Sequence, residues 1–519
     1  MASTGLLVVS NIKQLGKSLR SIEKYVHSLY IHLNVNASTA SPPPAWSRLI
    51  SQLYADSGSY VGTKVDLRVL LTPLKLQQHD TRVLKLRKPV DIIFSDAHQP
   101  ELCDRLRTAL NISKPTIFLE DPSSMDWQLQ LPTEAAEGSS QQVYPNVVIG
   151  GTFDRIHIGH KIFLTQAVLR AHKRLVVGVT TPAMTKNKVL PELILSYEER
   201  IRLLREFLLD IDNTLHYDIV PIDDPFGPTA SDPDLQLIVV SGETLRGAHK
   251  VNELRATKQL CQLDIYTIDI VESKVNDAIH ESKVSSSNTR IDLLGTRWRQ
   301  PEARPHLPNR PYIIGLTGGI ASGKSKMAAR LGQMGAHVID CDKVAHDVYE
   351  PGQDCYEKIV KHFGNGILSE DGRIDRTKLG PRVFGNPQEL QLLNSIVWPE
   401  LMVEVNKRLA KLRAAAEMPK VVVLEAAVLL KAGWESNCHE VWSMIVPPEE
   451  AVKRVMERNN LSENEARNRL ANQVNNADIV AKSQVIFSSQ WDYEFTQRQA
   501  ERAWQMLHKE LERKQHSSL

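Results

Sequence analysis

Two histidines three residues apart are the first side chains of this sequence whose spacing suits chemistry. His157 and His160 follow an apolar run, residues 147–149, at the point where a helix is expected to begin. Small residues at a strand end let the backbone approach a phosphate, and free N–H groups at a helix start bind anions. Imidazole N–H groups there can stabilise phosphoryl oxygens and a leaving pyrophosphate as charge develops. The pattern predicts nucleotidyl transfer that needs no covalent nucleophile.

A serine-rich tract near the end of the same segment gives the second half of this site. The run Ser285–Ser287 precedes a helical stretch, and Arg290 follows one turn later. Hydroxyl and N–H groups at a helix start, followed by an arginine, suit the β- and γ-phosphates of ATP. Either motif alone is weak, because histidine pairs and serine-rich loops are common, but both in this order predict an ATP site. We expect catalysis by His157 and His160 and ATP contacts from Gly151, Thr152, Phe153, His160, Ser285, Ser286, Ser287 and Arg290.

A glycine-rich loop further along the chain predicts a second ATP site. Residues 318–325 fit the pattern G-x-x-x-x-G-K-[ST], after an apolar strand and before a helix. In such a loop, backbone N–H groups surround the β-phosphate, Lys324 reaches the β- and γ-phosphate oxygens, and the Ser325 hydroxyl binds Mg²⁺. Lys324 is also expected to be catalytic, and the ATP-binding residues are expected to be Gly318, Gly319, Ile320, Ala321, Ser322, Gly323, Lys324 and Ser325.

Two carboxylates and one polar helix complete the second candidate site. Asp340 and Asp342 end the next expected strand, where a phosphoryl acceptor needs a base and Mg²⁺ needs ligands. One of them could instead cap a turn, but we expect at least one of the two to be functional. Arg469 lies on a polar stretch, residues 463–473, that is typical of a mobile lid over phosphates. A charged surface helix is the alternative interpretation of that stretch.

Alternating strand and helix patterns must position these residues, and they predict an α/β protein. The expected organisation is a Rossmann-like nucleotidyltransferase domain followed by a P-loop kinase domain, preceded by an N-terminal α/β region without a catalytic motif. The expected boundaries are 1–121 for the N-terminal region, 122–143 for a linker, 144–296 for the nucleotidyltransferase domain, 297–309 for a proline-rich linker and 310–519 for the kinase domain.

Within the N-terminal region, the pattern predicts both kinds of element. The expected strands are 5–10, 30–35, 65–71, 91–95 and 116–121, and the expected helices are 12–28, 46–54 and 101–110. A long helix, residues 491–516, is expected to close the chain.

Composition excludes several classes of protein. Lys and Arg total 63 against 61 Asp and Glu, which gives no basic excess for nucleic-acid binding. The 5 cysteines form no close pair, which favours reduced thiols over a zinc or disulfide site. No apolar run approaches the ~20 residues of a membrane span. Residues 1–34 resemble a mitochondrial presequence, but a strand at 5–10 favours an ordinary helix. We therefore expect a cytoplasmic protein and leave open an association with a mitochondrial surface.

The first candidate domain resembles phosphopantetheine adenylyltransferase, in the form seen in eukaryotes and archaea. The similarity extends to residues 184–200 and 239–247, although Ser287 stands where that family usually has Thr. The resemblance implies that Thr152 and either Lys186 or Lys188 contact the phosphopantetheine phosphate, and we prefer Lys186. An expected helix, 243–260, carries Arg246, Asn252 and Arg255. These residues either border the nucleotide or form ion pairs on the helix surface, and both interpretations stay open.

The second candidate domain resembles dephospho-CoA kinase. Residues 315–325, 372–376 and 383–387 match the family's pattern, and Asp342 aligns with its base for the ribose 3′-hydroxyl. Arg469 and Gln473 fit the end of the family's lid. This sequence departs from the pattern at three positions, where it has Ala321, Trp398 and Glu425.

The order of the two candidate domains resembles that of the bifunctional coenzyme A synthases of animals. The resemblances imply adenylyl transfer to 4′-phosphopantetheine and then phosphorylation of dephospho-CoA, with ATP and Mg²⁺ and without a tightly bound cofactor. One alternative is a nicotinamide-mononucleotide adenylyltransferase fused to a ribosylnicotinamide kinase. Another is a scaffold that has lost turnover, which the intact motifs at His157, His160, Lys324, Ser325 and Asp342 disfavour.

Overall fold

The computed structural model describes residues 4–35, 42–60, 65–76, 84–119, 129, 142–269, 271–273, 275, 277–384 and 386–516. The chain forms two compact units, Met1–Thr289 and Arg290–Leu519. Within the described ranges, strands form three five-stranded sheets whose neighbours all run parallel, which confirms the predicted α/β class. The predicted linker 122–143 lies outside the described residues except for Leu129, Gln142 and Val143.

The N-terminal sheet has the strand order β3-β2-β1-β4-β5. Its strands fall where the sequence pattern predicts them, but the helix expected at 12–28 is wrong in length, because α1 ends at Ile22 and Ser28 already begins β2. The elements are β1 (Thr4–Val9), α1 (Leu15–Ile22), β2 (Ser28–Leu33), α2 (Ser47–Tyr60), β3 (Asp66–Val69), α3 (Thr72–Leu76), β4 (Ile92–Ser95), α4 (Pro100–Ala109) and β5 (Ile117–Phe118).

The second sheet of the first unit has the order β10-β9-β6-β7-β8. Its first strand is central, the second and third lie on one side, and the fourth and fifth lie on the other, as in the N-terminal sheet. The elements are β6 (Tyr144–Gly151), α5 (Ile158–Arg170), β7 (Ala171–Thr180), α6 (Pro182–Thr185), α7 (Tyr197–Ile211), β8 (His216–Ile222), β9 (Leu237–Ser241), α8 (Leu245–Thr257), β10 (Asp264–Ile268) and α9 (Ser286–Leu293).

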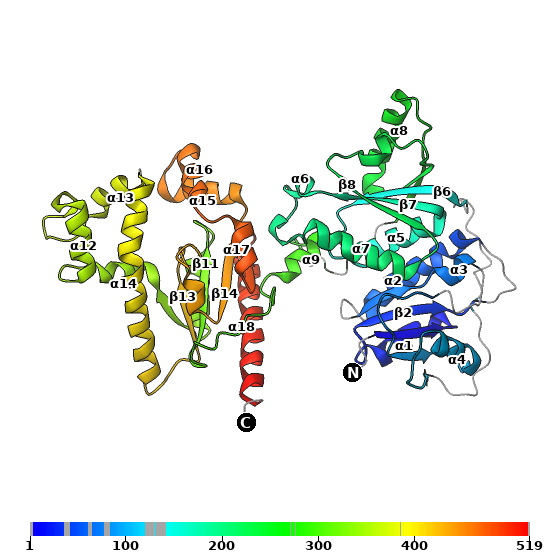
Figure 1. Ribbon diagram of the computed structural model, residues 1–519, viewed down its shortest axis with the longest axis horizontal. Helices are drawn as coiled ribbons and strands as arrows, with labels where there is room; N and C mark the ends of the chain where they lie inside the picture. Colours follow the sequence, from blue (N-terminus) through cyan, green and yellow to red (C-terminus); the bar gives the residue numbers. More distant parts are fainter. Residues whose placement is uncertain are drawn as a thin grey trace. The chain divides into compact units, whose positions relative to one another are not determined.

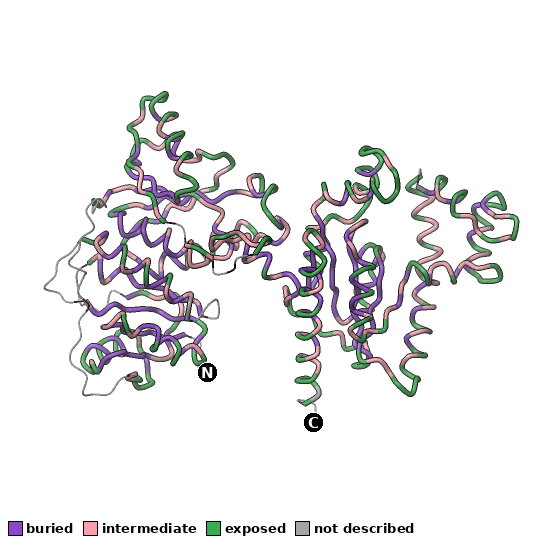
Figure 2. Tube along the Cα trace, turned by 180° about the vertical axis from the view of Figure 1, so that it is seen from behind, coloured by how far each residue is buried: buried purple, intermediate pink, exposed green. Residues whose placement is uncertain are grey.

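One hydrophobic core joins these two sheets. It contains Leu7 and Ile31 of the N-terminal sheet together with Val147 and Val177 of the second sheet, all fully buried. Helices α2 and α5 pack against each other between the sheets, and α7 packs against β3 (Figure 1). Buried residues run through both sheets and the helices between them (Figure 2). The N-terminal region is therefore folded onto the second sheet and shares its core.

The second unit is built on a sheet of order β12-β13-β11-β14-β15. Helices α10 and α18 cover one face, and their core includes Ile314, Leu331 and Val423. The elements are β11 (Tyr312–Gly318), α10 (Lys324–Gln333), β12 (His337–Asp340), α11 (Cys341–Val348), α12 (Asp354–Phe363), α13 (Arg376–Phe384), α14 (Pro387–Ala414), β13 (Val421–Glu425), β14 (Glu440–Ile445), α15 (Pro448–Asn459), α16 (Glu463–Ala471), α17 (Asn476–Lys482), β15 (Val485–Ser488) and α18 (Tyr493–His516).

Two groups of helices extend from this sheet (Figure 1). Helices α12 and α13 pack against the long helix α14, and α15 packs against α16. Val455 and Ala466 fill the contact between α15 and α16, where Ile320 and Ala321 also pack. In the described part of the chain, no helix is long and apolar enough to cross a membrane.

The segment after α9 is fastened to the second unit. Arg297 pairs with Glu440 and Glu510, and the Trp298 N–H donates to the Gln484 carbonyl at 2.8 Å. Gly295 has φ +71°, and a Cβ there would lie 2.3 Å from the Gln499 carbonyl oxygen. Only glycine fits this close backbone approach.

Replacing Gly295 with alanine should therefore destabilise the second unit. The left-handed φ costs roughly 1–2 kcal/mol and the overlap with Gln499 adds to it. Gly352→Ala is the matched control, because φ there is +91° but nothing lies within 4 Å of the added Cβ. Urea unfolding of the two variants checks this, and an equal loss in free energy of unfolding would contradict the role given to the Gln499 contact.

Candidate active sites

The first candidate site is formed by the turn between β6 and α5. Phe153 and Arg155 both adopt φ +49° in this turn, a left-handed conformation that is rare for residues other than glycine. His157 is the N-cap of α5, and its Nδ1 accepts a hydrogen bond from the His160 N–H at 3.4 Å. Because Nδ1 is an acceptor, the proton of neutral His157 lies on Nε2, where it can be donated.

The two histidine rings lie against each other. Their centroids are 3.9 Å apart with an interplanar angle of 24°, and Phe153 supports His160 from 5.4 Å. The buried Nδ1 of His160 has no hydrogen-bond partner among the residues that the structure describes. A buried polar atom without a partner is costly, and an incoming phosphoryl oxygen would satisfy it. The geometry suits a pair of neutral donors.

Burial keeps both histidines neutral. It lowers the pKa of His157 to about 4, with Asp154 and Glu281 opposing this shift and Lys161 adding to it. Burial also lowers the pKa of His160, and the neighbouring His157 and Lys188 lower it further. At neutral pH these side chains can stabilise developing negative charge as hydrogen-bond donors, without acting as acids.

A hydrogen bond joins the two predicted halves of this site. The Ser286 hydroxyl donates to the Asp154 carbonyl at 2.7 Å across 132 residues of sequence. Ser285 caps α9 by accepting from the Asn288 N–H at 3.1 Å. A Cβ at Gly159 would lie 3.2 Å from the His157 ring and 3.6 Å from the Val284 carbonyl oxygen. Gly159 thus lets the serine tract approach the histidine turn.

Other predicted residues take varied positions. Thr152 accepts a hydrogen bond from the Thr180 hydroxyl at 3.1 Å, and Gly151 ends β6. Arg290 is buried on α9, one turn after Ser286. Lys186 is exposed at the end of α6.

Two arginines of this domain donate hydrogen bonds to backbone carbonyls, and the sequence analysis did not predict these interactions. Arg200 is 1% exposed and donates to the carbonyls of Thr152 and Thr180 at 2.7 and 2.8 Å. Arg255 is fully buried and donates to three carbonyls, so the expectation of a nucleotide contact or a surface ion pair was wrong for it. A guanidinium can bind several carbonyls at once, and periodicity does not reveal such partners.

The second candidate site is the loop between β11 and α10. The Lys324 ammonium and the Ser325 hydroxyl both contact one oxygen of Glu425, at 2.8 and 2.6 Å. Glu425 ends β13, the neighbour of β11, and is 4% exposed. A carboxylate at this place is suited to Mg²⁺ held together with the loop serine. Glu425 was noted in the sequence only as a departure from a pattern, although its place at the end of a buried strand is a signal for function.

Ala321 sits in the loop with φ +58°, and Gly323 has φ +88°. Arg454 of α15 supports the loop from outside, because its guanidinium donates to the Ser489 hydroxyl at 2.7 Å while that hydroxyl donates to the Ser322 carbonyl at 2.8 Å. Of the remaining loop residues, Gly318 ends β11, and Gly319 and Ile320 follow it.

The two aspartates after β12 take different roles. Asp340 is the N-cap of α11 and accepts from the N–H groups of Asp342 and Lys343. Asp342 lies in the first turn of α11 and is not its N-cap. Desolvation raises its pKa, Lys324 opposes this shift, and the carboxylates of Asp340 and Glu425 add to it. His346 also opposes the rise in the Asp342 pKa, and burial and Arg376 lower the pKa of His346.

The predicted lid contacts the loop through Gln473. Its amide oxygen accepts from the Ile320 N–H at 2.6 Å, which is a position that a phosphate oxygen can take. Arg469 is exposed on α16, and Arg467 on the same helix pairs with Glu449 and Glu463. The lid helix thus carries one exposed arginine beside an ion-paired one.

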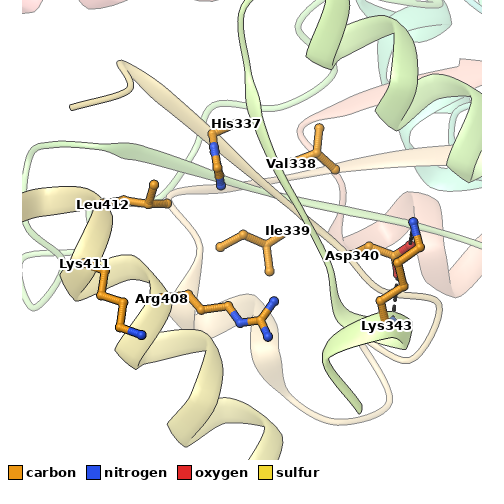
Figure 3. Close-up of a pocket in the computed structure, with 8 residues that line it drawn as sticks. All are labelled: His337, Val338, Ile339, Asp340, Lys343, Arg408, Lys411 and Leu412. Atoms are coloured by element: carbon orange, nitrogen blue, oxygen red, sulfur yellow. Dashed lines mark hydrogen bonds and ion pairs between the residues drawn. The ribbon is translucent and has the colours of Figure 1, made fainter. Parts of the chain in front are cut away.

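A pocket of about 440 Å³ lies along the edge strand β12 (Figure 3). Its cations are largely paired, because Lys343 lies 3.3 Å from Asp340 and Arg408 lies 2.7 Å from Asp347. The pocket is lined by His337, Val338, Ile339, Asp340, Lys343, Arg408, Lys411 and Leu412. Among the described residues, no group of three or more metal-binding side chains is present.

Fold and sites together define a bifunctional transferase with a nucleotidyltransferase-like site and a P-loop kinase site. Residues 148–291 match the cytidylyltransferase-like family, and residues 312–492 match the dephospho-CoA kinase family. The dephospho-CoA kinase of Carboxydothermus hydrogenoformans is 41% identical over 187 residues, 36% of this chain and 90% of that protein. That of Moorella thermoacetica is 40% identical over 200 residues, 38% of this chain and 94% of that protein.

A solved dephospho-CoA kinase from Campylobacter jejuni is 25% identical, covers 38% of this chain and 97% of its own, and has a TM-score of 0.31. On its sequence relatives, this chain belongs to the dephospho-CoA kinase family through its second unit.

Ala321→Gly should stabilise the second unit by up to about 1 kcal/mol, because glycine tolerates the left-handed φ that costs alanine energy. Ala328→Gly in helix α10 is the control and should destabilise the unit, since glycine is unfavourable within a helix. Thermal unfolding of both variants measures the difference. Equal losses of stability would show that the loop conformation imposes no strain on Ala321.

The two histidines of the first site should remain neutral in the folded protein at pH values below the ordinary histidine pKa. In the unfolded chain a histidine takes up its proton near pH 6.5, so lowered pKa values in the fold mean that stability falls as pH drops from about 6.5 toward 4. NMR titration of the ring protons in native and urea-unfolded protein tests this. Protonation of both rings near pH 6.5 in the native protein would contradict it.

Proposed function

We propose that this chain carries out two consecutive ATP-dependent transfers. In the first, ATP gives its adenylyl group to 4′-phosphopantetheine, which yields dephospho-CoA and pyrophosphate. In the second, ATP phosphorylates the ribose 3′-hydroxyl of dephospho-CoA, which yields CoA and ADP. The observation that carries the proposal is the contact of Lys324, Ser325 and Glu425 in the kinase site, in a chain whose Ser286 also donates to the Asp154 carbonyl of the histidine turn.

In the adenylyl transfer, a phosphate oxygen of phosphopantetheine attacks the α-phosphorus of ATP, and pyrophosphate leaves. His157 and His160 are placed to donate to the oxygens that gain charge, because they are neutral and stacked at the start of α5. Ser285, Ser286, Ser287 and Arg290 would bind the β- and γ-phosphates. Thr152 and Lys186 would bind the phosphate of the acceptor, and Lys188 is a second candidate because its charge acts on His160.

In the phosphoryl transfer, Asp342 accepts the proton of the 3′-hydroxyl while Lys324 holds the β- and γ-phosphates. Its raised pKa makes Asp342 a better base than an aspartate with the ordinary pKa. Ser325 and Glu425 would hold Mg²⁺, which neutralises phosphate charge when it accompanies ATP. Arg469 would close over the phosphates from the lid.

The order of the two sites along the chain supports the proposed choice of substrates. The product of the first reaction is the acceptor of the second, so one chain supplies both steps. We assign adenylyl transfer to residues 144–296 and phosphoryl transfer to residues 310–519, with linkers at 122–143 and 297–309. The alternative with nicotinamide mononucleotide as acceptor is disfavoured by the relatives of the second unit, which are dephospho-CoA kinases. The expected cytoplasmic location, with association with mitochondria left open, stays part of this proposal.

Single substitutions should separate the two reactions. His160→Ala should lower pyrophosphate release from ATP and phosphopantetheine by roughly a hundredfold or more, because it removes a donor to the transition state. It should leave ADP formation from added dephospho-CoA unchanged. Lys324→Ala should do the reverse, and product analysis by chromatography measures both.

Parallel assays with nicotinamide mononucleotide test the alternative. Turnover of that acceptor, without turnover of phosphopantetheine, would overturn the proposal. Loss of both reactions in one folded single variant would show that the two sites are not independent.

A further inference from the structure

The N-terminal sheet repeats the strand order of the nucleotidyltransferase sheet, yet its corresponding turn is closed. In parallel α/β sheets, ligands bind where the order reverses, at the carboxyl ends of the central strands. Here that place lies between β1 and β4. The Asp96 carboxylate, 2% exposed, accepts from the Ser10 N–H at 2.8 and 2.9 Å and from the Asn11 N–H at 2.9 Å. An internal carboxylate therefore occupies the place of an anionic ligand.

The N-terminal region contacts the start of α5, the helix that follows His157 and carries His160. The Lys161 ammonium, one residue after His160, lies 2.6 Å from an Asp66 oxygen and donates to the Leu67 carbonyl at 2.9 Å, both on β3. Ile158, between the two histidines, fills the space above Gly58 of α2, where a Cβ would lie 2.5 Å from its Cδ1 atom. Residues on both sides of Gly159 are thus held by the N-terminal region.

The contact between Lys161 and Asp66 is not explained by its contribution to stability alone. Lys161 is 7% exposed, and burial of an ammonium costs several kcal/mol unless it is paired. It also lies in the first turns of α5, where the helix dipole disfavours a cation. Asp66 is in turn held by Arg68, which pairs with Asp210 of α7. Movement of Lys161 away from Asp66 would leave its buried ammonium without this carboxylate partner, which is costly.

We propose that Lys161 is a positioning residue for adenylyl transfer, and that the N-terminal region holds it, through Asp66 and Leu67 of β3, so that His157 and His160 keep their geometry. This inference rests on the proposed function. It assigns to the described residues of the N-terminal region a mechanical role in the first reaction.

The charge of Lys161 gives this role a signature. Lys161 lowers the pKa of His157, whereas Asp154, from the turn before α5, and Glu281, from the segment before α9, raise it. Removal of the ammonium should therefore raise the pKa of His157. The acid limb of the pH profile of adenylyl transfer should then move to higher pH in Lys161→Met.

The test compares two buried lysines at the two ends of α5 in the full-length chain. Lys161→Met removes the ammonium at the start of the helix. Lys75→Met is the matched control, because Lys75 joins the N-terminal region to the other end of α5 through the Val168 and Ala171 carbonyls, and it pairs with Asp212 at the end of α7. Lys161→Met should lower the kcat of pyrophosphate release about tenfold to a hundredfold. The KM for ATP should change little in this variant.

Lys75→Met should lower thermal stability while kcat stays near that of the unchanged chain, and the kinase reaction on added dephospho-CoA should be unaffected in both variants. Asp66→Asn, which keeps an oxygen for Lys161, is the second variant if Lys161→Met does not fold, and it should lower kcat in the same direction. NMR of the His157 and His160 rings reports their positions without any assay of activity.

Unchanged kcat in Lys161→Met, or equal losses in Lys161→Met and Lys75→Met, would overturn the inference. Absence of pyrophosphate release in the unchanged chain would instead count against the proposed function. In that case the ring signals decide: a shift in Lys161→Met but not in Lys75→Met supports positioning, and no shift overturns it.

Discussion

The unpaired N–H groups at the turn after a central strand are the constraint on which this structure depends. A helix start cannot satisfy them from within the helix, so another group must do so. In the N-terminal sheet the Asp96 carboxylate accepts from two of them. In the second sheet the His157 ring accepts one, and in the third the Gln473 amide accepts one. The same geometry is closed by a carboxylate in one sheet and remains suited to phosphate in the other two.

Buried cations follow the same logic. Lys324 and Lys161 are both largely buried, and each has a carboxylate partner on a neighbouring strand, Glu425 and Asp66. An unpaired buried ammonium would be too costly to retain. The two carboxylates have different surroundings. Glu425 also accepts a hydrogen bond from the Ser325 hydroxyl at the candidate phosphate site, whereas Asp66 belongs to β3, in a region without a catalytic motif. We propose that the first pair serves substrate binding and that the second serves the placement of a helix.

Much of the fold was predictable, because parallel strands and their helices leave a periodic apolar pattern. The strands of the N-terminal region were predicted within a few residues, and the closing helix was found at Tyr493–His516. The length of α1 was not, since charged residues after Ile22 continue a helical pattern that β2 interrupts. The interactions of Arg255 and Arg200 were also beyond prediction, because a buried guanidinium selects its carbonyl partners by three-dimensional proximity.

The sequence by itself predicted the chemistry, since the glycine-rich loop, and the histidine pair followed by the serine tract, combine residue types in an order and spacing that few other functions need. The tertiary structure alone decided which groups meet. It brought Ser286 to Asp154 across 132 residues, placed Glu425 on Lys324 and Ser325, and joined Asp66 to Lys161. The physical reason is that short motifs follow local helix and strand geometry, whereas partners for buried charges come from whichever strand the sheet order places alongside them.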